Sequence, residues 1–381
     1  MNRRDRLMAT LRGEPVDRPA VCFYEITGYD QDTKSTDPFN IFSHPSWKPL
    51  LDMTWERTDI IPRRNVPFVD APPNPMKELT RTEKWMDDKG SRFVRTTVKA
   101  GNRTLTNTTR RDPDVDTVWT TEHLLKDEDD FRAWIDLPQA AFGGTPDIEP
   151  VLKAEREIGD RGIVLIDFGD PLCSVASLFD MATYTVIALT EENLMHRALE
   201  KVQSLRLQQV EAIAAALPGR LWRIVGPEYA SPPYLPPRLF REYVTRYDKP
   251  MCDAIKRHGG FPRIHSHGRL NDVLDYIAET GCTGLDPVEP PHQGDVSLAY
   301  VREHYGEQMV LFGNIEATDI ENLPTEQFRV KVETALREGT SGRGRGFVLL
   351  PSACPYGRVL PDRALRNYEA MIELTEHWQT P

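Results

Sequence analysis

The residues of this chain that most clearly suggest chemistry are two histidines, His265 and His267, separated by one serine. In an extended strand, residues two apart point to the same face, so both imidazoles would project together. Glu289 and Cys354 follow 22 and 87 residues after His267. Two imidazoles, a carboxylate and a thiolate suit Zn²⁺ better than Mg²⁺ or Ca²⁺. The pattern therefore predicts a candidate zinc site at His265, His267, Glu289 and Cys354.

Each of these residues also has an ordinary structural interpretation. The two histidines are compatible with polar residues that line a barrel and hydrogen-bond to neighbouring side chains. Glu289 is compatible with an ion pair to Arg269, and Cys354 with a small buried side chain, as most free cysteines are. The residues alone leave both interpretations open.

The elements that must position these residues are short apolar runs that recur from about residue 160 onward. Their length and β-branched content predict strands over 162–170, 221–228, 261–268, 283–289, 309–316 and 346–353. Segments of helical period separate the runs, so we expect parallel strands with helical crossovers. Two further strand-like runs, at 20–24 and 59–61, make an eight-stranded (β/α) TIM-type barrel the preferred fold class. A doubly wound sheet is the alternative, but its glycine-rich phosphate turn is absent.

The first third of the chain departs from this rhythm. Residues 84–123 are rich in threonine and alternate polar with apolar side chains, and Asp88-Lys-Gly90 and Gly101-Asn102 supply turns. This pattern predicts β-hairpins that decorate the barrel. We expect one domain over residues 1–381, in which about 1–150 hold an N-terminal extension and the hairpins, and 160–381 hold the regular β/α units.

Polar side chains lie at or just past the end of each predicted strand. In a barrel of parallel strands these ends meet at one rim, where catalytic residues sit. We therefore expect Asp170, Glu228 and Asn314 to orient substrate or move a proton. The residues at the six strand ends are Asp167, Asp170, Glu228, His265, His267, Asp286, Glu289, Asn314, Glu316 and Cys354.

Composition excludes several classes of protein. The chain has 381 residues and a net charge of −11, without the broad positive field that nonspecific nucleic-acid binding needs. It has no apolar run long enough to span a bilayer and no apolar segment typical of a signal peptide. Five scattered cysteines suggest reduced thiols, so we expect a cytoplasmic protein.

Several segments resemble the uroporphyrinogen decarboxylase superfamily, which includes the corrinoid-dependent methyltransferases. The resemblance covers nearly the whole chain and implies a (β/α) barrel that is often a homodimer. It rests on the opening Arg3–Ala20, on Leu239–Tyr247, on Ile255–Gly259, on Ile264-His-Ser-His-Gly-Arg269, on Gly294-Asp295, on Leu311-Phe-Gly-Asn-Ile315 and on Phe347–Ser352.

The chain differs from the decarboxylases proper after the first predicted strand. There they carry Arg-Gln-Ala-Gly-Arg, whose arginines meet the carboxylates of the tetrapyrrole. The corresponding Phe23–Tyr29 contains Glu25 and no arginine. Glu25 would repel a polyanionic substrate, and Arg63-Arg64 would compensate only in part. Tetrapyrrole decarboxylation is therefore disfavoured.

The methyltransferase branch holds zinc with His-x-Cys, sometimes a Glu, and a distant Cys. His265, Glu289 and Cys354 match this pattern, and His267 replaces the first Cys. The resemblance implies a zinc-dependent methyltransferase that moves a methyl group from a small O- or N-methyl substrate to a corrinoid protein. Cobalamin would arrive on that partner, since the chain lacks Asp-x-His-x-x-Gly.

Aromatic side chains near the strand ends are candidates for the substrate site, although barrel packing explains them equally well. We expect Glu25, Tyr24 and Tyr229 to contact substrate, and Phe23, Tyr29 and Trp55 are further candidates. Two alternative functions remain. One is a metal-free decarboxylase or lyase with Glu25, Asp170 or Glu228 as the acid. The other is a non-catalytic small-molecule binder on the same barrel.

Overall fold

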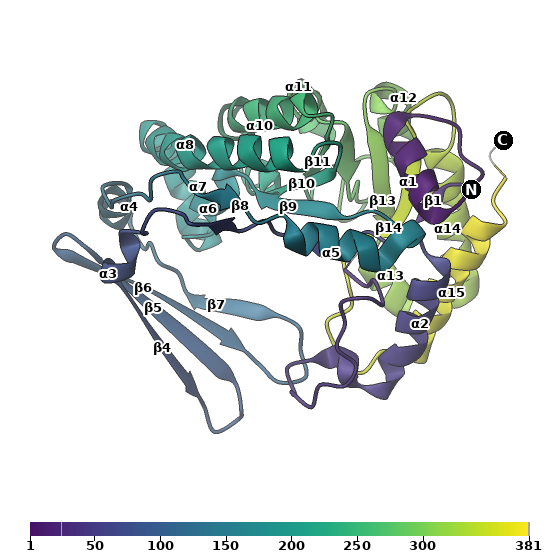
Figure 1. Ribbon diagram of the computed structural model, residues 1–381, viewed down its shortest axis with the longest axis horizontal. Helices are drawn as coiled ribbons and strands as arrows, with labels where there is room; N and C mark the ends of the chain where they lie inside the picture. Colours follow the sequence, from purple (N-terminus) through teal and green to yellow (C-terminus); the bar gives the residue numbers. More distant parts are fainter. Residues whose placement is uncertain (24, 380–381) are drawn as a thin grey trace.

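Eight parallel strands form a curved sheet in the order β1-β14-β13-β12-β11-β10-β9-β2 (Figure 1). The computed structural model describes residues 1–23 and 25–379. The strands are β1 (Ala20–Val21), β2 (Arg63–Arg64), β9 (Leu165–Gly169), β10 (Leu221–Val225), β11 (Phe261–His265), β12 (Gly284–Asp286), β13 (Val310–Ile315) and β14 (Phe347–Pro351). The predicted (β/α) barrel is confirmed, and a flat doubly wound sheet is excluded.

The two ends of the sheet, β1 and β2, meet at Asp59. The Asp59 backbone N–H donates to the Val21 carbonyl at 2.7 Å, and the Val21 N–H donates to Asp59 Oδ2 at 3.0 Å. Arg6 Nη1 and Arg18 Nη1 also lie 2.7 and 3.1 Å from the fully buried Asp59 carboxylate. Asp59 therefore closes the barrel.

The strand predicted over 59–61 was placed too early. Arg63–Arg64 pair with β9, whereas Ile60 makes only an isolated bridge to Gly162. Backbone pairing nevertheless begins within the predicted run, since the Ile60 N–H donates to the Arg161 carbonyl and the Ile163 N–H donates to the Ile60 carbonyl, both at 3.1 Å.

Helix α1 (Arg3–Arg12) lies beneath the barrel. Asn2 caps it by accepting from the Asp5 N–H, and Gly13 ends it in the left-handed conformation at φ 72°. Leu7 and Leu11 belong to a buried apolar cluster with strand residues that include Leu165, Leu221 and Val310. The floor of the barrel is thus apolar.

The remaining helices surround the sheet. Between β10 and β11 runs one continuous helical segment made of α9 (Pro237–Phe240), a π-helical turn (Arg241–Thr245) and α10 (Arg246–Arg257). The others are α2 (Lys48–Arg57), α3 (Met76–Leu79), α4 (Glu128–Ile135), α5 (Glu149–Ile158), α6 (Pro171–Ala176), α7 (Met181–Thr190), α8 (Glu192–Ala216), α11 (Leu274–Glu279), α12 (Leu298–Tyr305), α13 (Ala317–Asn322), α14 (Thr325–Gly339) and α15 (Asp362–Glu376). In the described part of the chain, no helix combines the length and apolarity that crossing a membrane requires.

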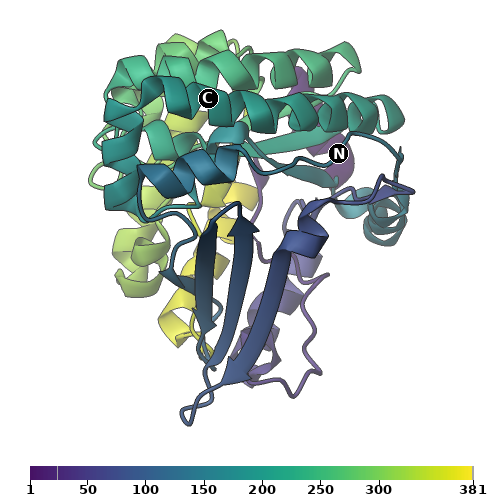
Figure 2. The ribbon, with the colours of Figure 1, turned by 90° about the vertical axis from the view of Figure 1, so that its left-hand side faces the viewer.

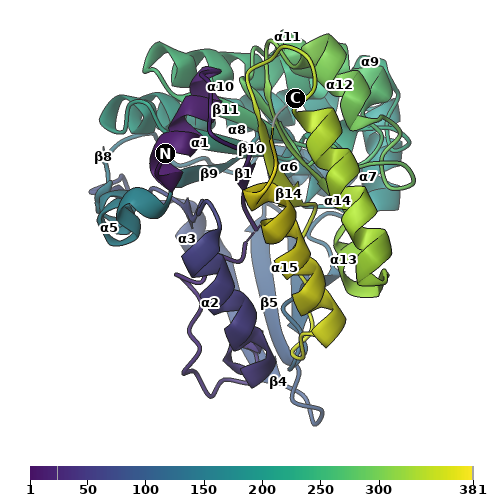
Figure 3. The same ribbon diagram turned by 90° about the vertical axis from the view of Figure 1, so that its right-hand side faces the viewer.

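Helices α2 and α15 come from opposite ends of the chain and lie side by side (Figure 3). An ion pair between Arg57 and Glu376, with a nitrogen–oxygen distance of 2.6 Å, joins them. The N-terminal extension is therefore packed against the last helix of the barrel.

A four-stranded antiparallel sheet projects from the barrel (Figure 2). Its strands are β4 (Thr80–Met86), β5 (Arg92–Ala100), β6 (Arg103–Arg111) and β7 (Val118–Glu122). They are the predicted hairpins. A separate antiparallel pair, β3 (Phe68–Val69) and β8 (Thr145–Pro146), is formed by segments that precede and follow them in the chain. The loop after β6 is attached to the barrel, because Val115 bridges to Gly357 and the Asp116 N–H donates to the Tyr356 carbonyl at 2.8 Å.

Barrel closure at Asp59 yields the first prediction. Asp59→Asn removes the buried charge shared by Arg6 and Arg18 and leaves Arg6 only its pairing with Asp17, so we expect the free energy of unfolding in urea to fall by about 3 kcal/mol. The matched control is Asp52→Asn in α2, whose side chain is 54% exposed and pairs with Lys48. The control should change stability by less than about 0.5 kcal/mol. Equal losses in both variants would contradict the role of Asp59.

Candidate active site

Charged side chains cross the inside of the barrel above its apolar floor. Asp167 of β9 and Arg223 of β10 are partners in the ladder, and their side chains form a two-point ion pair at 2.7 and 3.0 Å. Arg63 Nη1 of β2 lies 3.7 Å from the same Asp167 carboxylate. Burial lowers the pKa of Arg223 to about 10, so this guanidinium remains charged at neutral pH.

The second half of this charged layer centres on Asp286 at the end of β12. Its Oδ1 lies 3.0 Å from Arg263 Nε, and its Oδ2 lies 2.7 Å from His265 Nδ1. Burial alone would raise the pKa of Asp286, but the charges of Arg263 and His265 outweigh it and hold the pKa at about 2. An ionised Asp286 therefore fixes the orientation of the His265 ring.

Arg223 and Arg263 were not among the predicted site residues, although both lie in this layer. They are ladder partners in adjacent strands. Each occupies the third position of an apolar strand, Leu-Trp-Arg-Ile-Val and Phe-Pro-Arg-Ile-His. An arginine at the same position of two successive strands was a usable signal, because a charge there must be paired inside the barrel.

His267 and Glu289 form a hydrogen-bonded pair at the rim. His267 Nδ1 lies 2.8 Å from Glu289 Oε1, and the Gly268 N–H donates to Glu289 Oε2 at 2.8 Å. Burial would lower the pKa of His267, but the hydrogen bond and charge of Glu289 outweigh it and raise the pKa. The raised pKa favours the imidazolium form of His267, which can donate a proton through Nε2.

The pair lines a cavity of about 430 Å³, which we call the histidine cavity. Two of the predicted residues, Glu228 and Tyr229, also line it. The other walls are Met181, Pro232, Pro233, Tyr234, Gly268, Arg269 and Gln293. An acidic proton donor thus faces a partly aromatic space.

Glu316, at the N-terminus of α13, is a second group that titrates near neutrality. Burial and the negative charge of Glu289 raise the pKa of Glu316 to about 7. Ser352 Oγ donates to its Oε2 at 3.2 Å. The sequence placed Glu316 at a strand end but gave no reason to prefer it, because its pKa depends on a neighbour 27 residues earlier in the chain.

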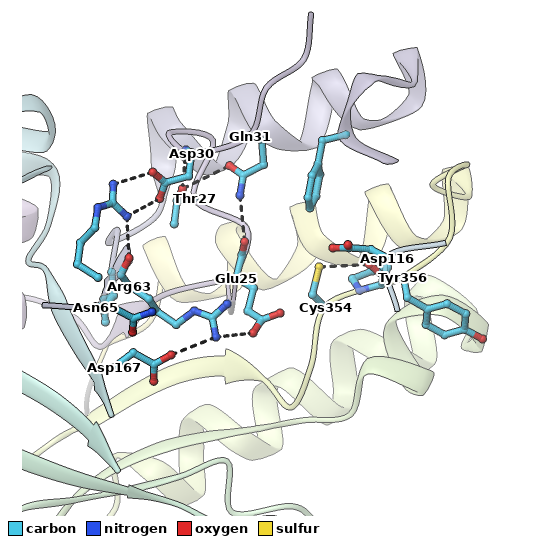
Figure 4. Close-up of a pocket in the computed structure, with 14 residues that line it drawn as sticks. Glu25, Thr27, Asp30, Gln31, Arg63, Asn65, Asp116, Asp167, Cys354 and Tyr356 are labelled. Carbon is cyan, nitrogen blue, oxygen red and sulfur yellow. Dashed lines mark hydrogen bonds and ion pairs between the residues drawn. The ribbon is translucent and has the colours of Figure 1, made fainter. Parts of the chain in front are cut away.

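A larger cavity of about 540 Å³, the mouth cavity, opens beside β1, β2 and β14 (Figure 4). Glu25, the predicted substrate contact, lines it and pairs with Arg63 at 2.8 Å. Arg64 pairs with Asp30 at 2.7 Å. In all, four carboxylates and two guanidiniums line the cavity: Glu25, Asp30, Asp116, Asp167, Arg63 and Arg64.

Cys354 lies in the mouth cavity and not with the predicted zinc ligands. Its Sγ donates to the Pro355 carbonyl at 3.2 Å, and burial raises the pKa of the thiol well above its ordinary value. Figure 4 shows the sulfur on the same side of the cavity as Asp116. With no metal bound, the thiol therefore favours its neutral form.

The four proposed zinc ligands are only partly brought together. The rings of His265 and His267 are neighbours, with centroids 4.8 Å apart, and Glu289 bonds to His267. Over residues 1–23 and 25–379, no three His, Cys, Asp or Glu side chains gather as a metal site. As arranged, these residues do not fit a four-coordinate zinc ion.

The remaining predicted site residues are Asn314, Tyr24 and the aromatic candidates for the substrate site. Asn314 lines a third, smaller cavity together with Glu316, and Tyr24 lies outside the described residues. Phe23 is core, packed on Tyr368, while Tyr29 stacks on Trp55 with ring centroids 6.1 Å apart. Sequence alone did not separate these packing residues from the cavity residue Tyr229.

Asp170 lines none of these three cavities, and its role as a catalytic candidate stays a prediction. It is fully buried and caps α6 by accepting from the Cys173 N–H at 2.5 Å. Its Oδ2 and both carboxylate oxygens of the buried Asp248 have no hydrogen-bond partner among the described residues. Burial raises the pKa of Asp170, and the charge of Asp248 raises it further. This buried acid pair therefore favours its protonated form.

Comparison with known proteins places this geometry in context. The family model described as Uroporphyrinogen decarboxylase (URO-D) matches residues 144–378. No curated protein sequence matches the chain. A solved methyltransferase from Methanosarcina mazei is 17% identical, with a TM-score of 0.57, and the match covers 99% of this chain and 98% of that one. At this identity the similarity shows the shared fold alone.

Two further solved structures are more distant. A sugar phosphate isomerase/epimerase from Parabacteroides distasonis is 9% identical, with a TM-score of 0.43, and the match covers 96% of this chain and 98% of that one. A D-psicose 3-epimerase from Clostridium cellulolyticum is 10% identical, with a TM-score of 0.33, and the match covers 60% and 82%. Neither is similar enough to inform the function.

The buried acid pair generates a prediction about pH and stability. A carboxyl whose pKa is higher in the folded chain than in the unfolded chain contributes stability that is lost as pH rises through the folded pKa. Asp248→Asn removes one of the two carboxyls and with it this loss of stability at high pH. We expect its free energy of unfolding to exceed that of the wild type at pH 8, because burial raises the pKa of both carboxyls in the folded chain. The advantage should shrink at pH 5.

The control for this experiment is Asp253→Asn in the same helix, α10. Its side chain is 42% exposed and lies near Lys249 and Lys256. We expect it to gain no stability between pH 5 and pH 8 in urea unfolding. A pH-independent difference for Asp248→Asn would show that the pair is not protonated in the folded chain.

Proposed function

Because the chain belongs to the uroporphyrinogen decarboxylase family, we propose that it is an enzyme of this family that removes a methyl group from a small O- or N-methyl substrate. The observation that carries the proposal is the His267–Glu289 pair, a proton donor facing the histidine cavity. The fold shared with a solved methyltransferase supports it at the level of architecture.

The charge of the mouth cavity argues against a tetrapyrrole substrate. Four carboxylates and two guanidiniums line it, and Glu25 already occupies Arg63. A substrate with many carboxylates would meet repulsion and find few unoccupied donors. A small neutral or cationic molecule meets no such penalty, which is the substrate class that we propose.

Proton donation is the step that the chain's own residues supply. When a methyl group leaves oxygen or nitrogen, the electron pair of the broken bond stays on that atom, which needs a proton. His267 donates it from Nε2, while Glu289 holds Nδ1 and stabilises the imidazolium before transfer. His265, fixed by Asp286, packs edge-on against His267 and limits its rotation.

The methyl acceptor that we propose is a reduced corrinoid carried by a partner protein, which supplies a strongly nucleophilic electron pair. We further propose that this exchange takes place in the cytoplasm, with a homodimer as the functional unit. Zinc bound by His265, His267, Glu289 and Cys354 stays a prediction, and no step is derived through it.

The proton-donation step predicts the effect of His267→Gln. General acids contribute about 10²- to 10⁴-fold, so we expect kcat for methyl transfer to free cob(I)alamin to fall by at least about 10²-fold. In the wild type, kcat should fall as pH rises through the raised pKa of His267, because the imidazolium is lost. Glu289→Gln should move this fall to lower pH.

The control is His258→Gln, a histidine that bonds to Glu211 on the outside of the barrel. It should retain wild-type kcat with a panel of methyl ethers and methylamines. Release of carbon dioxide from a carboxylate substrate, with no methyl transfer to any acceptor, would instead favour a decarboxylase. Ligand binding without any product would favour a non-catalytic binder.

The zinc prediction is tested by metal analysis of unchelated protein. Binding by the four residues would give one zinc per chain and lose most of it in Cys354→Ala, because water does not replace the charge and softness of a thiolate. Equal zinc content in the wild type and this variant would exclude Cys354 as a ligand.

A further inference from the structure

The projecting antiparallel sheet ends in an edge strand, β4, that has a neighbour on one side only. The strand order is β4-β5-β6-β7, so β4 pairs with β5, and no other described segment pairs with it. Figure 1 shows β4 on the outer side of this sheet, away from the barrel. Residues 81–86 are all exposed. The backbone groups along the outer side of β4 are therefore available to another strand.

β4 lacks features that commonly keep an edge strand from pairing. Its register with β5 runs unbroken over Thr80–Met86, and the strand contains no proline. The opposite edge strand, β7, differs, because a register shift between Thr108 and Thr109 interrupts its ladder with β6. Irregularities of this kind bend an edge and discourage pairing. Of the two edges, β4 is therefore the better suited to adding a strand.

Arg81 and Glu83 carry opposite charges on one face of β4, since residues two apart in a strand share a face. Among the residues that the structure describes, neither side chain has a hydrogen-bond or ion-pair partner. Arg95 is the ladder neighbour of Glu83. Its Nε donates to Thr108 Oγ1 at 3.2 Å and lies 4.0 Å from Glu122 Oε2, so it does not neutralise Glu83. The exposed edge therefore offers one cation and one anion, two residues apart.

A second copy of the same strand fits these charges. Two identical antiparallel strands related by a two-fold axis place one residue opposite itself, and the others pair symmetrically about it. Centring the pair on Arg81, Glu83 or Lys84 would place like charges opposite each other. Centring it on Thr82 instead places Arg81 of each copy opposite Glu83 of the other, and Thr80 opposite Lys84. Of these four registers, only the one centred on Thr82 gives two pairs of opposite charge and no pair of like charge.

We propose that β4 pairs antiparallel with β4 of a second copy of this chain, with Thr82 at the two-fold axis. This pairing joins the two projecting sheets into one continuous sheet. It closes as a dimer, because each copy uses the same edge. The inference rests on the homodimer included in the proposed function and specifies its surface, but it does not depend on the methyl-transfer step.

Charge reversal tests the register. Glu83→Arg places two positive charges opposite each other at Arg81, and Arg81→Glu places two negative charges opposite each other at Glu83. We expect each variant to raise the dissociation constant of the dimer at least about tenfold in sedimentation equilibrium, because like charges across an interface are repulsive. The two variants change the net charge in opposite directions, so a general charge effect would not weaken both. The double variant Arg81→Glu/Glu83→Arg restores both ion pairs and should recover the wild-type constant.

The matched control is Lys84→Glu, which reverses a charge on the same strand. Lys84 lies opposite the uncharged Thr80 in the proposed register, so the dissociation constant should stay within about twofold of the wild type. An interface of this size is small and binds weakly, so the measurements extend to about 300 μM chain.

Cross-linking gives a second readout at the two-fold axis. Thr82→Cys places two thiols opposite each other, and bismaleimidoethane should join them into a covalent dimer. Thr120→Cys is the control, because Thr120 is an exposed residue of the other edge strand, β7. It should give no more covalent dimer than the wild type, whose five native cysteines set the background.

A wild type that stays monomeric over the whole concentration range would overturn the inference. A dimer whose dissociation constant is unchanged in Glu83→Arg would overturn it as well, and would mean that the homodimer uses another surface. A folded double variant that fails to recover the dimer would refute the register. Methyl-transfer activity is not part of either readout, so its absence would count against the proposed function and not against this interface.

Discussion

Charged side chains inside a parallel barrel must find their partners on neighbouring strands, because the interior offers them little water. This constraint organises the upper half of the barrel. Asp167 forms an ion pair with Arg223, and Asp286 pairs with both Arg263 and His265. The layer separates the apolar floor, against which α1 packs, from the polar rim.

Ion pairs and hydrogen bonds among the rim residues also determine which cavity each residue lines. Glu289 is held by His267 and by a backbone N–H, which leaves it facing the histidine cavity. Glu25 forms an ion pair with Arg63, and both Glu25 and Cys354 line the mouth cavity. The same rim therefore carries a proton donor in the histidine cavity and ion-paired side chains in the mouth cavity. This arrangement suits the small uncharged or cationic substrate that we propose.

The projecting antiparallel sheet is tied to this rim. Through the bridge between Val115 and Gly357, the loop after β6 reaches the segment that follows β14 and places Asp116 in the mouth cavity. Residues more than 200 positions apart in the chain thereby share one wall. The packing of α2 on α15 joins the same two regions of sequence from outside the barrel.

The sequence by itself determined the barrel, the hairpins and the rim location of His267, Glu289 and Glu228, because local periodicity and strand ends are encoded in neighbouring residues. Only the tertiary structure decided which rim groups meet. Cys354 was grouped with the histidines, yet it lines another cavity, and Asp170 proved to be a buried helix cap. The protonation of Glu316 likewise depends on burial and on Glu289. Which rim side chains meet depends on the tilt and stagger of the strands around the barrel. The spacing of residues along the chain does not specify either.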